Sequence, residues 1–408
     1  MRRGRRIVLS IVAAAGSIVL VLVLVLLGSA SEGPLSSMLR GVGSGVSRLE
    51  STLARRFRRA GRVEQLGWLA SYRTDAALVR QPDTLLLGAY GGQIATTLEG
   101  MIELEEAIGS PLALMHLYSA WGDAPDQAFP RRIAEAVREL GSLPVITWEP
   151  WLTTFENRLH PDLPLRADRD DGGLADITAG LYDFYIDAWA KDAARFGSPI
   201  LVRLAHEMND PYRYPWGPQN NQPQDFIAAW RHVVDRFRAA GADNVVWVWS
   251  PHVAYEGYGA YWPGDEYVDW VATGALNYGT VAYWSRWWTF REIFGRHYEF
   301  LVGLGKPIMI AEFGSLEVGG DRAEWYAAAL GDIRLRHPAV RALLFFHVHD
   351  DATVTRQSVD WTFLDDPGVV AAVREGLRLR PEPASPPPRP TATPPRTDGP
   401  SSSPAPSR

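Results

Sequence analysis

The sequence predicts an α/β fold, a (β/α)8 (TIM) barrel over residues 81–380, from two observations. Short apolar segments rich in β-branched residues recur along this part of the chain, and helical stretches separate most of them. Strands that alternate with helices are typical of a parallel sheet. Eight such units fit a barrel of about 250 residues plus insertions. An open doubly wound sheet is the second choice, because no glycine-rich turn follows a strand.

The expected strands are short and end in polar or aromatic residues. In chain order they are 84–90, 112–118, 143–151, 199–207, 244–252, 272–278, 307–315 and 340–350. Stretches such as FPRRIAEAVREL and PQDFIAAWRHVVDRFRAA lie between them and predict helices. In a barrel of this kind the carboxyl ends of the strands form one rim, which carries the active site.

The two ends of the chain differ in composition from the barrel segment. MRRGRR is followed by residues 7–27 without a charge, close to the roughly 20 residues that cross a bilayer core. We expect a transmembrane signal-anchor there, with the basic residues 1–6 in the cytoplasm and the remainder outside. A signal peptide cleaved near Gly28-Ser29-Ala30 is the alternative, and it would give a secreted protein.

Two further segments flank the expected barrel. Residues 28–80 are rich in Gly, Ser and Arg, and predict a juxtamembrane stalk with a helix around Val46–Leu69. Residues 381–408 are rich in Pro and Ser, and predict a disordered, extended tail.

Composition excludes several function classes. The chain has 41 Lys+Arg against 47 Asp+Glu, a net charge of −6, so no general affinity for nucleic acid is expected. Cysteine is absent, which excludes disulfides, thiol nucleophiles and thiolate metal sites. The 16 tryptophans are unusual and suit a surface that stacks on flat ligands such as sugar rings.

Polar and aromatic residues gather where the expected strands end. These endings are Trp148-Glu149-Pro150-Trp151, His206-Glu207, Ser250-Pro251-His252, Asn277-Tyr278, Glu312, and His347 with His349 and Asp350. Because the carboxyl ends of barrel strands share one rim, their recurrence predicts a polar, aromatic cleft there.

Two carboxylates are expected to face each other across this cleft. Since side chains alternate along a strand, Arg203 and Glu207 share one face of the fourth strand. By the same alternation Ile308, Ile310 and Glu312 share one face of the seventh. A pair of carboxylates flanking a sugar-binding cleft is the equipment of glycoside hydrolysis.

The two glutamates need different pKa values to act as acid and nucleophile. Arg203 and Tyr278 are the expected hydrogen-bond donors to Glu312. The alternative is a buried ion pair between Arg203 and Glu207 with no catalytic role.

The sequence motifs give little support for a metal site or for esterase chemistry. His206-Glu207 begins like a helical zinc motif, but Asp210 stands where the second histidine is required. His347 and His349 offer metal ligands, yet rim histidines more often bind ligand hydroxyls. No Gly-x-Ser-x-Gly elbow is present. We therefore expect neither a metal nor another cofactor.

Two motifs carry a resemblance to a known family. VRLAHEMND…YPWG at 202–217, followed by KPIMIAEFGS at 306–315, resembles glycoside hydrolase family 26 over about residues 80–375. The resemblance implies a retaining enzyme with catalytic glutamates at the ends of strands four and seven. Asp210 replaces a common glycine, and the eighth strand lacks the tryptophan of many relatives, so the resemblance leaves the polysaccharide open.

The resemblance also implies roles for individual residues. Glu207 corresponds to the acid/base, Glu312 to the nucleophile, and Tyr278 to a tyrosine that hydrogen-bonds the nucleophile. Residues expected to bind substrate are Trp148, Glu149, Arg203, His206, Trp216, Tyr278, Trp284 and His347.

The sequence thus predicts a monomeric, retaining endo-β-glycanase that hydrolyses mannan, glucomannan or β-glucan. It is expected to be membrane-anchored with an extracellular catalytic domain, or secreted if the leader is cleaved. The alternative function is a weakly hydrolytic or non-hydrolytic component that binds or trims polysaccharide during its synthesis and export.

Overall fold

A computed structural model describes residues 61–92, 94, 97–282, 284–353, 355 and 357–378. The expected cytoplasmic segment 1–6, signal-anchor 7–27 and tail 381–408 lie outside the described residues, as does 28–60 of the expected stalk. Of the helix expected around Val46–Leu69, residues 61–65 are described and helical. No helix within the described ranges is long and apolar enough to cross a membrane.

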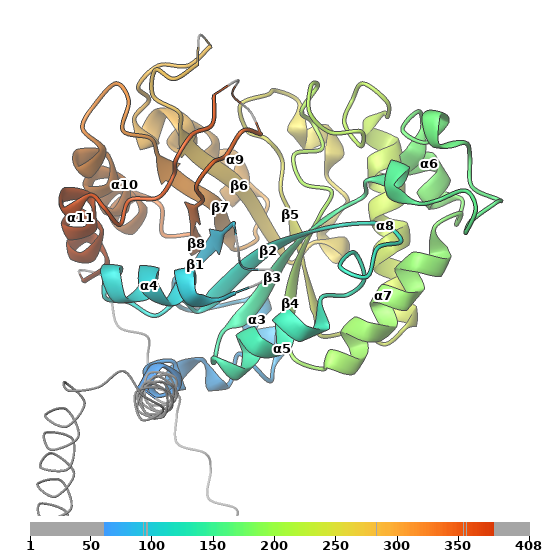
Figure 1. Cartoon of the computed structure of the whole chain (residues 1–408), viewed down its shortest axis with the longest axis horizontal. Helices are drawn as coiled ribbons and strands as arrows, with labels where there is room; N and C mark the ends of the chain where they lie inside the picture. Colours follow the sequence, from blue (N-terminus) through green and yellow to red (C-terminus); the bar gives the residue numbers. More distant parts are fainter. Residues whose placement is uncertain are drawn as a thin grey trace, which may run out of the picture. The chain divides into compact units, whose positions relative to one another are not determined.

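Eight parallel strands close into a barrel in the order in which they occur along the chain, as predicted (Figure 1). The strands are β1 Leu86–Gly91, β2 Leu114–Ala120, β3 Leu143–Glu149, β4 Ile200–Leu204, β5 Val245–Trp249, β6 Trp270–Asn277, β7 Ile308–Ser315 and β8 Val340–His347. Each overlaps one of the segments expected from the sequence, and β8 pairs with β1 to complete the closure.

Helices surround this barrel (Figure 1). They are α3 Ala76–Arg80, α4 Glu99–Ile108, α5 Arg131–Glu139, α6 Gly173–Thr178, α7 Asp183–Phe196, α8 Pro223–Ala239, α9 Arg296–Gly303, α10 Arg322–Arg336 and α11 Pro367–Arg378. Short helical turns are η1 Gly67–Ala70, η2 Leu152–Thr154, η3 Arg166–Asp168, η4 Tyr258–Tyr261, η5 Asp265–Tyr267 and η6 Arg291–Gly295.

The barrel interior is a packed core. Leu114, Val145, Leu201 and Leu344 lie in one buried cluster inside the barrel, while the alternate residues of the strands pack in another cluster with the helices. The interior is tight at β1, where a Cβ on Gly88 would lie 2.7 Å from the Cβ of Leu114. The polar residues on the inward faces therefore gather toward the carboxyl ends of the strands.

Part of the segment expected to be a juxtamembrane stalk packs with the barrel. The described residues from 65 onward, including 65–80, belong to one compact unit. Leu66, Leu69 and Val79 are buried in the same cluster as the barrel interior, and Trp270 Nε1 donates to the Val79 carbonyl at 2.8 Å. These apolar side chains cover one end of the barrel, a role that the arginine-rich composition of the segment concealed.

Candidate functional site

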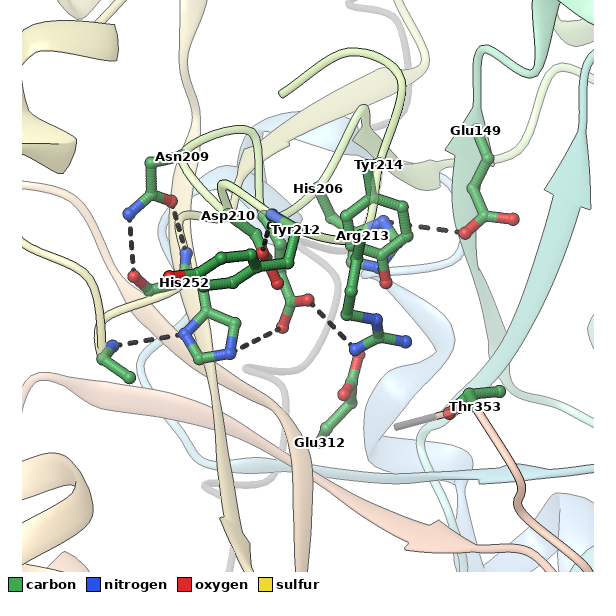
Figure 2. Close-up of polar contacts among 12 residues, drawn as sticks. Glu149, His206, Asn209, Asp210, Tyr212, Arg213, Tyr214, His252, Glu312 and Thr353 are labelled. Carbon is green, nitrogen blue, oxygen red and sulfur yellow. Dashed lines mark hydrogen bonds and ion pairs between the residues drawn. The ribbon is translucent and has the colours of Figure 1, made fainter. Parts of the chain in front are cut away.

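The catalytic candidates meet at the carboxyl ends of the strands. Glu207 follows β4, Glu312 lies near the end of β7, and Glu149 is the last residue of β3. Both Glu207 and Glu312 are 8% exposed, so each carboxylate has left most of its water. Figure 2 shows Glu149, Glu312 and the loop residues that follow β4 around one cleft.

The expectation that Ile308, Ile310 and Glu312 share one face of β7 is wrong. Ile308 and Ile310 pack outward with the helices, whereas Met309 and Ala311 point into the barrel. Simple alternation from these positions would turn Glu312 outward. The side chain nevertheless contacts inward-facing groups of other strands, so the alternation must break between Ala311 and Glu312.

A β-bulge in β7 breaks the alternation of side chains before Glu312. Ile310 pairs with Thr273 of β6, but Glu312 pairs with the very next residue, Gly274, so β7 carries one extra residue here. The register shifts against β8 over the same stretch. Because an extra residue turns the following side chain to the other face, the bulge places Glu312 in the cleft.

Two donors hold one oxygen of Glu312. Arg203 Nη2 and the Tyr118 hydroxyl each lie 2.6 Å from Oε1, and Arg203 Nη2 also donates to the Tyr118 hydroxyl at 2.9 Å. Burial by itself raises the pKa of Glu312, but the Arg203 charge and these hydrogen bonds outweigh it and hold the pKa below its ordinary value. Glu312 is therefore ionised, with Oε2 available to a ligand.

Glu207 owes its position to a turn. β4 ends at Leu204, and the left-handed backbone of Ala205 (φ 41°) and Glu207 (φ 53°) follows it. The Glu207 N–H donates to the Ser250 carbonyl after β5 at 2.7 Å, which fixes the turn. The alternation expected through residue 207 therefore ends before it, and strained backbone of this kind concentrates at functional sites.

The pKa of Glu207 is raised above its ordinary value. Burial raises its pKa and the Glu312 charge adds to this effect, against the lowering influence of His252 and Arg213. His252 Nε2 lies 4.0 Å from Oε1 and Arg213 Nη1 lies 3.5 Å from Oε2. The two glutamates thus have pKa values shifted in opposite directions, which is the pattern of an acid paired with a nucleophile.

Arg203 supports Glu312 and not Glu207. Its side chain is fully buried, and Nε donates to Thr147 Oγ1 at 2.7 Å while Nη2 reaches Glu312. The alternative of a catalytically silent ion pair between Arg203 and Glu207 is therefore wrong, because Arg203 pairs with Glu312 instead.

His206 and Glu149 lie beside each other at the cleft. His206 Nδ1 is 3.9 Å from Glu149 Oε1, and the Tyr214 hydroxyl is 3.0 Å from His206 Nε2. Burial, with the charges of Arg203 and Arg213, lowers the pKa of His206, so its ring is neutral. Burial raises the pKa of Glu149, although Trp151 Nε1 donates to its Oε2 at 3.2 Å.

Two tryptophans expected to contact sugar are core residues instead. Trp148 is 0% exposed, and its ring centroid lies 4.6 Å from that of Trp121 and 4.5 Å from that of Trp189. Trp216 is 2% exposed, stacks on Tyr214 and donates from Nε1 to the His206 carbonyl at 2.8 Å. Trp148 points away from the cleft, and Trp216 supports the loop that carries His206.

The other expected contacts have mixed positions. Trp284 is 48% exposed and lies edge-on to Tyr278 at 5.2 Å. Tyr278 makes no hydrogen bond to Glu312 in the described part of the chain, so the donor role expected for it belongs to Tyr118. His347 is buried against Phe363, and burial lowers its pKa to about 4.

Sequence reasoning missed Tyr118, Arg213 and Tyr212. Tyr118 ends the second expected strand on its inward face, a signal that was available. Arg213 and Tyr212 lie in the loop after Glu207, where no periodicity predicts side-chain direction. Tyr212 is 77% exposed and lies edge-on to Tyr255 at the cleft rim.

One group of potential metal ligands lies at this site within the described residues. Glu207, Asp210 and His252 bring donor atoms within 4.8 Å of one another. The Arg213 cation already lies 3.5 Å from the same Glu207 carboxylate. This positive charge disfavours a metal cation at the same carboxylate, so we assign no metal to the group.

Known proteins share both sequence and fold with this chain. A family model described as "Glycosyl hydrolase family 26" matches residues 180–305. Endoglucanase H of Acetivibrio thermocellus is 35% identical over 282 residues, which are 67% of this chain and 28% of that protein. Mannan endo-1,4-beta-mannosidase A and B of Caldalkalibacillus mannanilyticus is 26% identical over 181 residues, 43% of this chain and 32% of that protein. The chain therefore spans between a quarter and a third of these curated relatives.

A solved structure is similar in fold over most of the chain. The GH26 beta-mannanase from Bacteroides ovatus has a TM-score of 0.54 at 15% identity and covers 77% of this chain and 93% of its own. At this identity the likeness concerns the fold.

Proposed function

Because the chain belongs to glycoside hydrolase family 26, we propose that it is a retaining endo-β-glycanase. Its substrate is a β-linked polysaccharide, and the class includes mannan, glucomannan and β-glucan. The names of the two curated relatives, an endoglucanase and a mannan endo-mannosidase, support this class. The observation that carries the proposal is the pair of buried glutamates whose pKa values are shifted in opposite directions.

The first step forms a glycosyl-enzyme. Glu207 gives its proton to the glycosidic oxygen while Glu312 Oε2 attacks the anomeric carbon, so the C–O bond to the leaving sugar breaks and an ester bond forms. Arg203 and Tyr118 hold Oε1 and fix the direction of the attacking oxygen. Because both donors are in place before the substrate arrives, no reorganisation is needed during the reaction.

The second step releases the sugar. Glu207, now a carboxylate, takes a proton from a water molecule whose oxygen attacks the anomeric carbon and displaces Glu312. Two displacements restore the β configuration. In this proposal His206 and Glu149 hydrogen-bond hydroxyls of the bound sugar, and Trp284 stacks on a sugar ring; the supporting observations are the proximity of His206 to Glu149 and the exposure of Trp284.

The test is a substrate panel on the full chain. Mannan, glucomannan, mixed-linkage glucan, β-1,3-glucan and xylan are offered to the wild type and to Glu312→Ala, with release of reducing ends as the measurement. Glu317→Ala, on the loop after β7, is the matched control. We expect hydrolysis of at least one polymer by wild type and control, and loss of at least about 1,000-fold in Glu312→Ala. Hydrolysis that survives Glu312→Ala excludes this nucleophile, and binding without hydrolysis by the wild type supports the non-hydrolytic alternative.

We also propose that the protein acts as a monomer outside the cytoplasm, held by residues 7–27 or released after cleavage. The support is the uncharged segment behind a basic N-terminus. Cell fractionation with carbonate washing distinguishes an integral anchor from a secreted form. Recovery of the full chain in the cytoplasm would contradict both forms.

A further inference from the structure

Arg213 lies in the cleft beside the proposed acid/base. Its Nη1 is 3.5 Å from Glu207 Oε2, and its guanidinium lies 4.9 Å from the centroid of the Tyr214 ring. Figure 2 shows the side chain directed into the cleft toward Glu312, with which it also interacts electrostatically. Glu207 Oε2 has no hydrogen-bond partner among the described residues, so this ion pair is its principal contact.

This contact conflicts with the first chemical step. Glu207 must carry a proton to protonate the leaving oxygen, but a cation at this distance favours the carboxylate form. Arg213 and the proton therefore compete for the same carboxylate. The second step has the opposite need, because Glu207 then acts as a base and must be ionised.

Other charged groups that face Glu207 cannot relieve the conflict. Arg203 from β4 is fully buried and committed to Glu312 and Thr147. The ring of His252, after β5, accepts the Ala254 N–H at Nδ1, so its neutral form presents Nε2–H to Glu207. Two negative groups complete the surroundings: Glu312 from β7 and Asp210 from the β4 loop.

Arg213 differs from these groups in its freedom to move. Its side chain is 30% exposed, and its guanidinium donates no hydrogen bond in the described part of the chain. An outward rotation to water would break only the ion pair with Glu207 and the contact with the Tyr214 ring. The space that it leaves lies between the two catalytic carboxylates, where the reacting sugar must bind.

We propose that Arg213 is a positioning residue that favours the carboxylate form of Glu207 in the free enzyme and is displaced when substrate binds. Displacement removes the cation from Glu207, which then takes up one proton from solvent and becomes the acid of the first step. This inference rests on the proposed function, because it assigns Arg213 a role through the acid/base.

The rate test compares two pH profiles on the polymer that the wild type cleaves. The alkaline limb of kcat/KM reports the free enzyme and that of kcat reports the substrate complex. In the wild type the kcat/KM limb should lie below the kcat limb. In Arg213→Met the kcat/KM limb should rise by about one pH unit, the low end for a carboxylate that loses an arginine neighbour. The kcat limb should stay in place, because Arg213 has already left in the complex.

Matched variants control for charge and folding. Arg213→Lys retains the cation and should keep the wild-type separation of the two limbs. Arg195→Met removes an exposed arginine on α7, paired with Asp192, and should leave both profiles unchanged. Arg213→Gln is a second charge-free variant, should Arg213→Met fail to fold. Equal movement of both limbs would show that Arg213 stays on Glu207 throughout, and no movement would show that it does not act through Glu207.

A titration without substrate separates this inference from the proposed function. Carbon-13 labelled glutamate in the full chain gives carboxyl signals by NMR, and Glu207→Gln identifies the signal of Glu207. In Arg213→Met that signal should titrate about one pH unit higher than in the wild type, whether or not any polysaccharide is cleaved. An unchanged titration overturns the inference, while a shifted titration in a protein without hydrolytic activity overturns only the proposed function.

Discussion

Replacing Tyr118 by phenylalanine tests how the nucleophile is kept ionised. The substitution removes the hydroxyl that donates to Glu312 Oε1 at 2.6 Å and leaves Arg203 as the remaining donor. Tyr118 is tightly packed, with its ring 4.7 Å from Tyr90, and phenylalanine preserves the ring. The change is therefore close to the removal of one hydrogen bond to a charged acceptor.

The size of the effect follows from that bond. A hydrogen bond to a charged group contributes about 1.5–3 kcal/mol, and one pH unit corresponds to about 1.36 kcal/mol. Since Arg203 still holds the same oxygen, we take the lower value and expect the acid limb of kcat/KM to rise by about one pH unit. The acid limb rises because Glu312 must be ionised to attack, and its pKa moves back toward the ordinary 4.5.

Folding stability gives an independent measurement of the same bond. Because the pKa of folded Glu312 lies below its ordinary 4.5, the stability that it contributes is present above 4.5 and is lost as the pH falls through the lowered value. Tyr118→Phe should therefore cost about 1.5 kcal/mol in urea unfolding near pH 7, and less as the pH falls below 4.

The matched control is Tyr278→Phe. Tyr278 lies at the same cleft but donates no hydrogen bond to Glu312 within the described ranges, so its loss should leave the acid limb in place. An acid limb that moves in Tyr278→Phe and stays in Tyr118→Phe would refute the assignment of Tyr118 as the donor.

Four further predictions concern the acid, the barrel interior, helix α10 and the core. Glu207→Gln should lower kcat on polysaccharide by about 100- to 10,000-fold but much less on a nitrophenyl glycoside, whose leaving group needs no proton; equal losses would contradict an acid role. Gly88→Ala should lower the free energy of unfolding by about 1–3 kcal/mol, because its Cβ would lie 2.7 Å from Leu114 Cβ. Gly331→Ala in α10, with no atom within 4 Å of the new Cβ, should raise the free energy of unfolding by about 0.5–1 kcal/mol; urea unfolding measures both. Trp148→Phe should reduce Tm while the folded enzyme keeps its KM. A raised KM with unchanged Tm would instead indicate that Trp148 contacts substrate.

The barrel was predictable because its signal is repeated. Each strand is a short apolar run, and the order of strands and helices leaves few topologies for a parallel sheet. The limits of the domain were less predictable. Leu66, Leu69 and Val79 cover one end of the barrel, but they lie among arginines and glycines whose composition resembles a linker.

The positions of the two glutamates could be predicted, but not by the alternation used to orient them. A bulge at Ala311 turns Glu312 inward, and a left-handed turn places Glu207 after β4 has ended. Neither device has a periodic sequence signal, since each depends on pairing with neighbouring strands. The motifs nevertheless indicated two glutamates that the structure brings to one cleft.

Side-chain environments were the least predictable part of the site. The sequence predicts that Trp148 and Trp216 bind sugar at a tryptophan-rich rim, yet both side chains are buried. Whether a rim aromatic faces inward or outward depends on loop conformation and helix packing. Arg213 shows the same limit, because its ion pair with Glu207 depends on the path of the β4 loop.

The central claim, double displacement through Glu312 and Glu207, is tested most directly by proton NMR of the anomeric configuration of newly formed reducing ends. The spectra are recorded on a β-linked polymer that the enzyme cleaves, before mutarotation equilibrates the product. A retaining mechanism predicts that the β anomer forms first and the α anomer appears later. An α anomer that forms first would show direct attack by water and would contradict the nucleophilic role of Glu312.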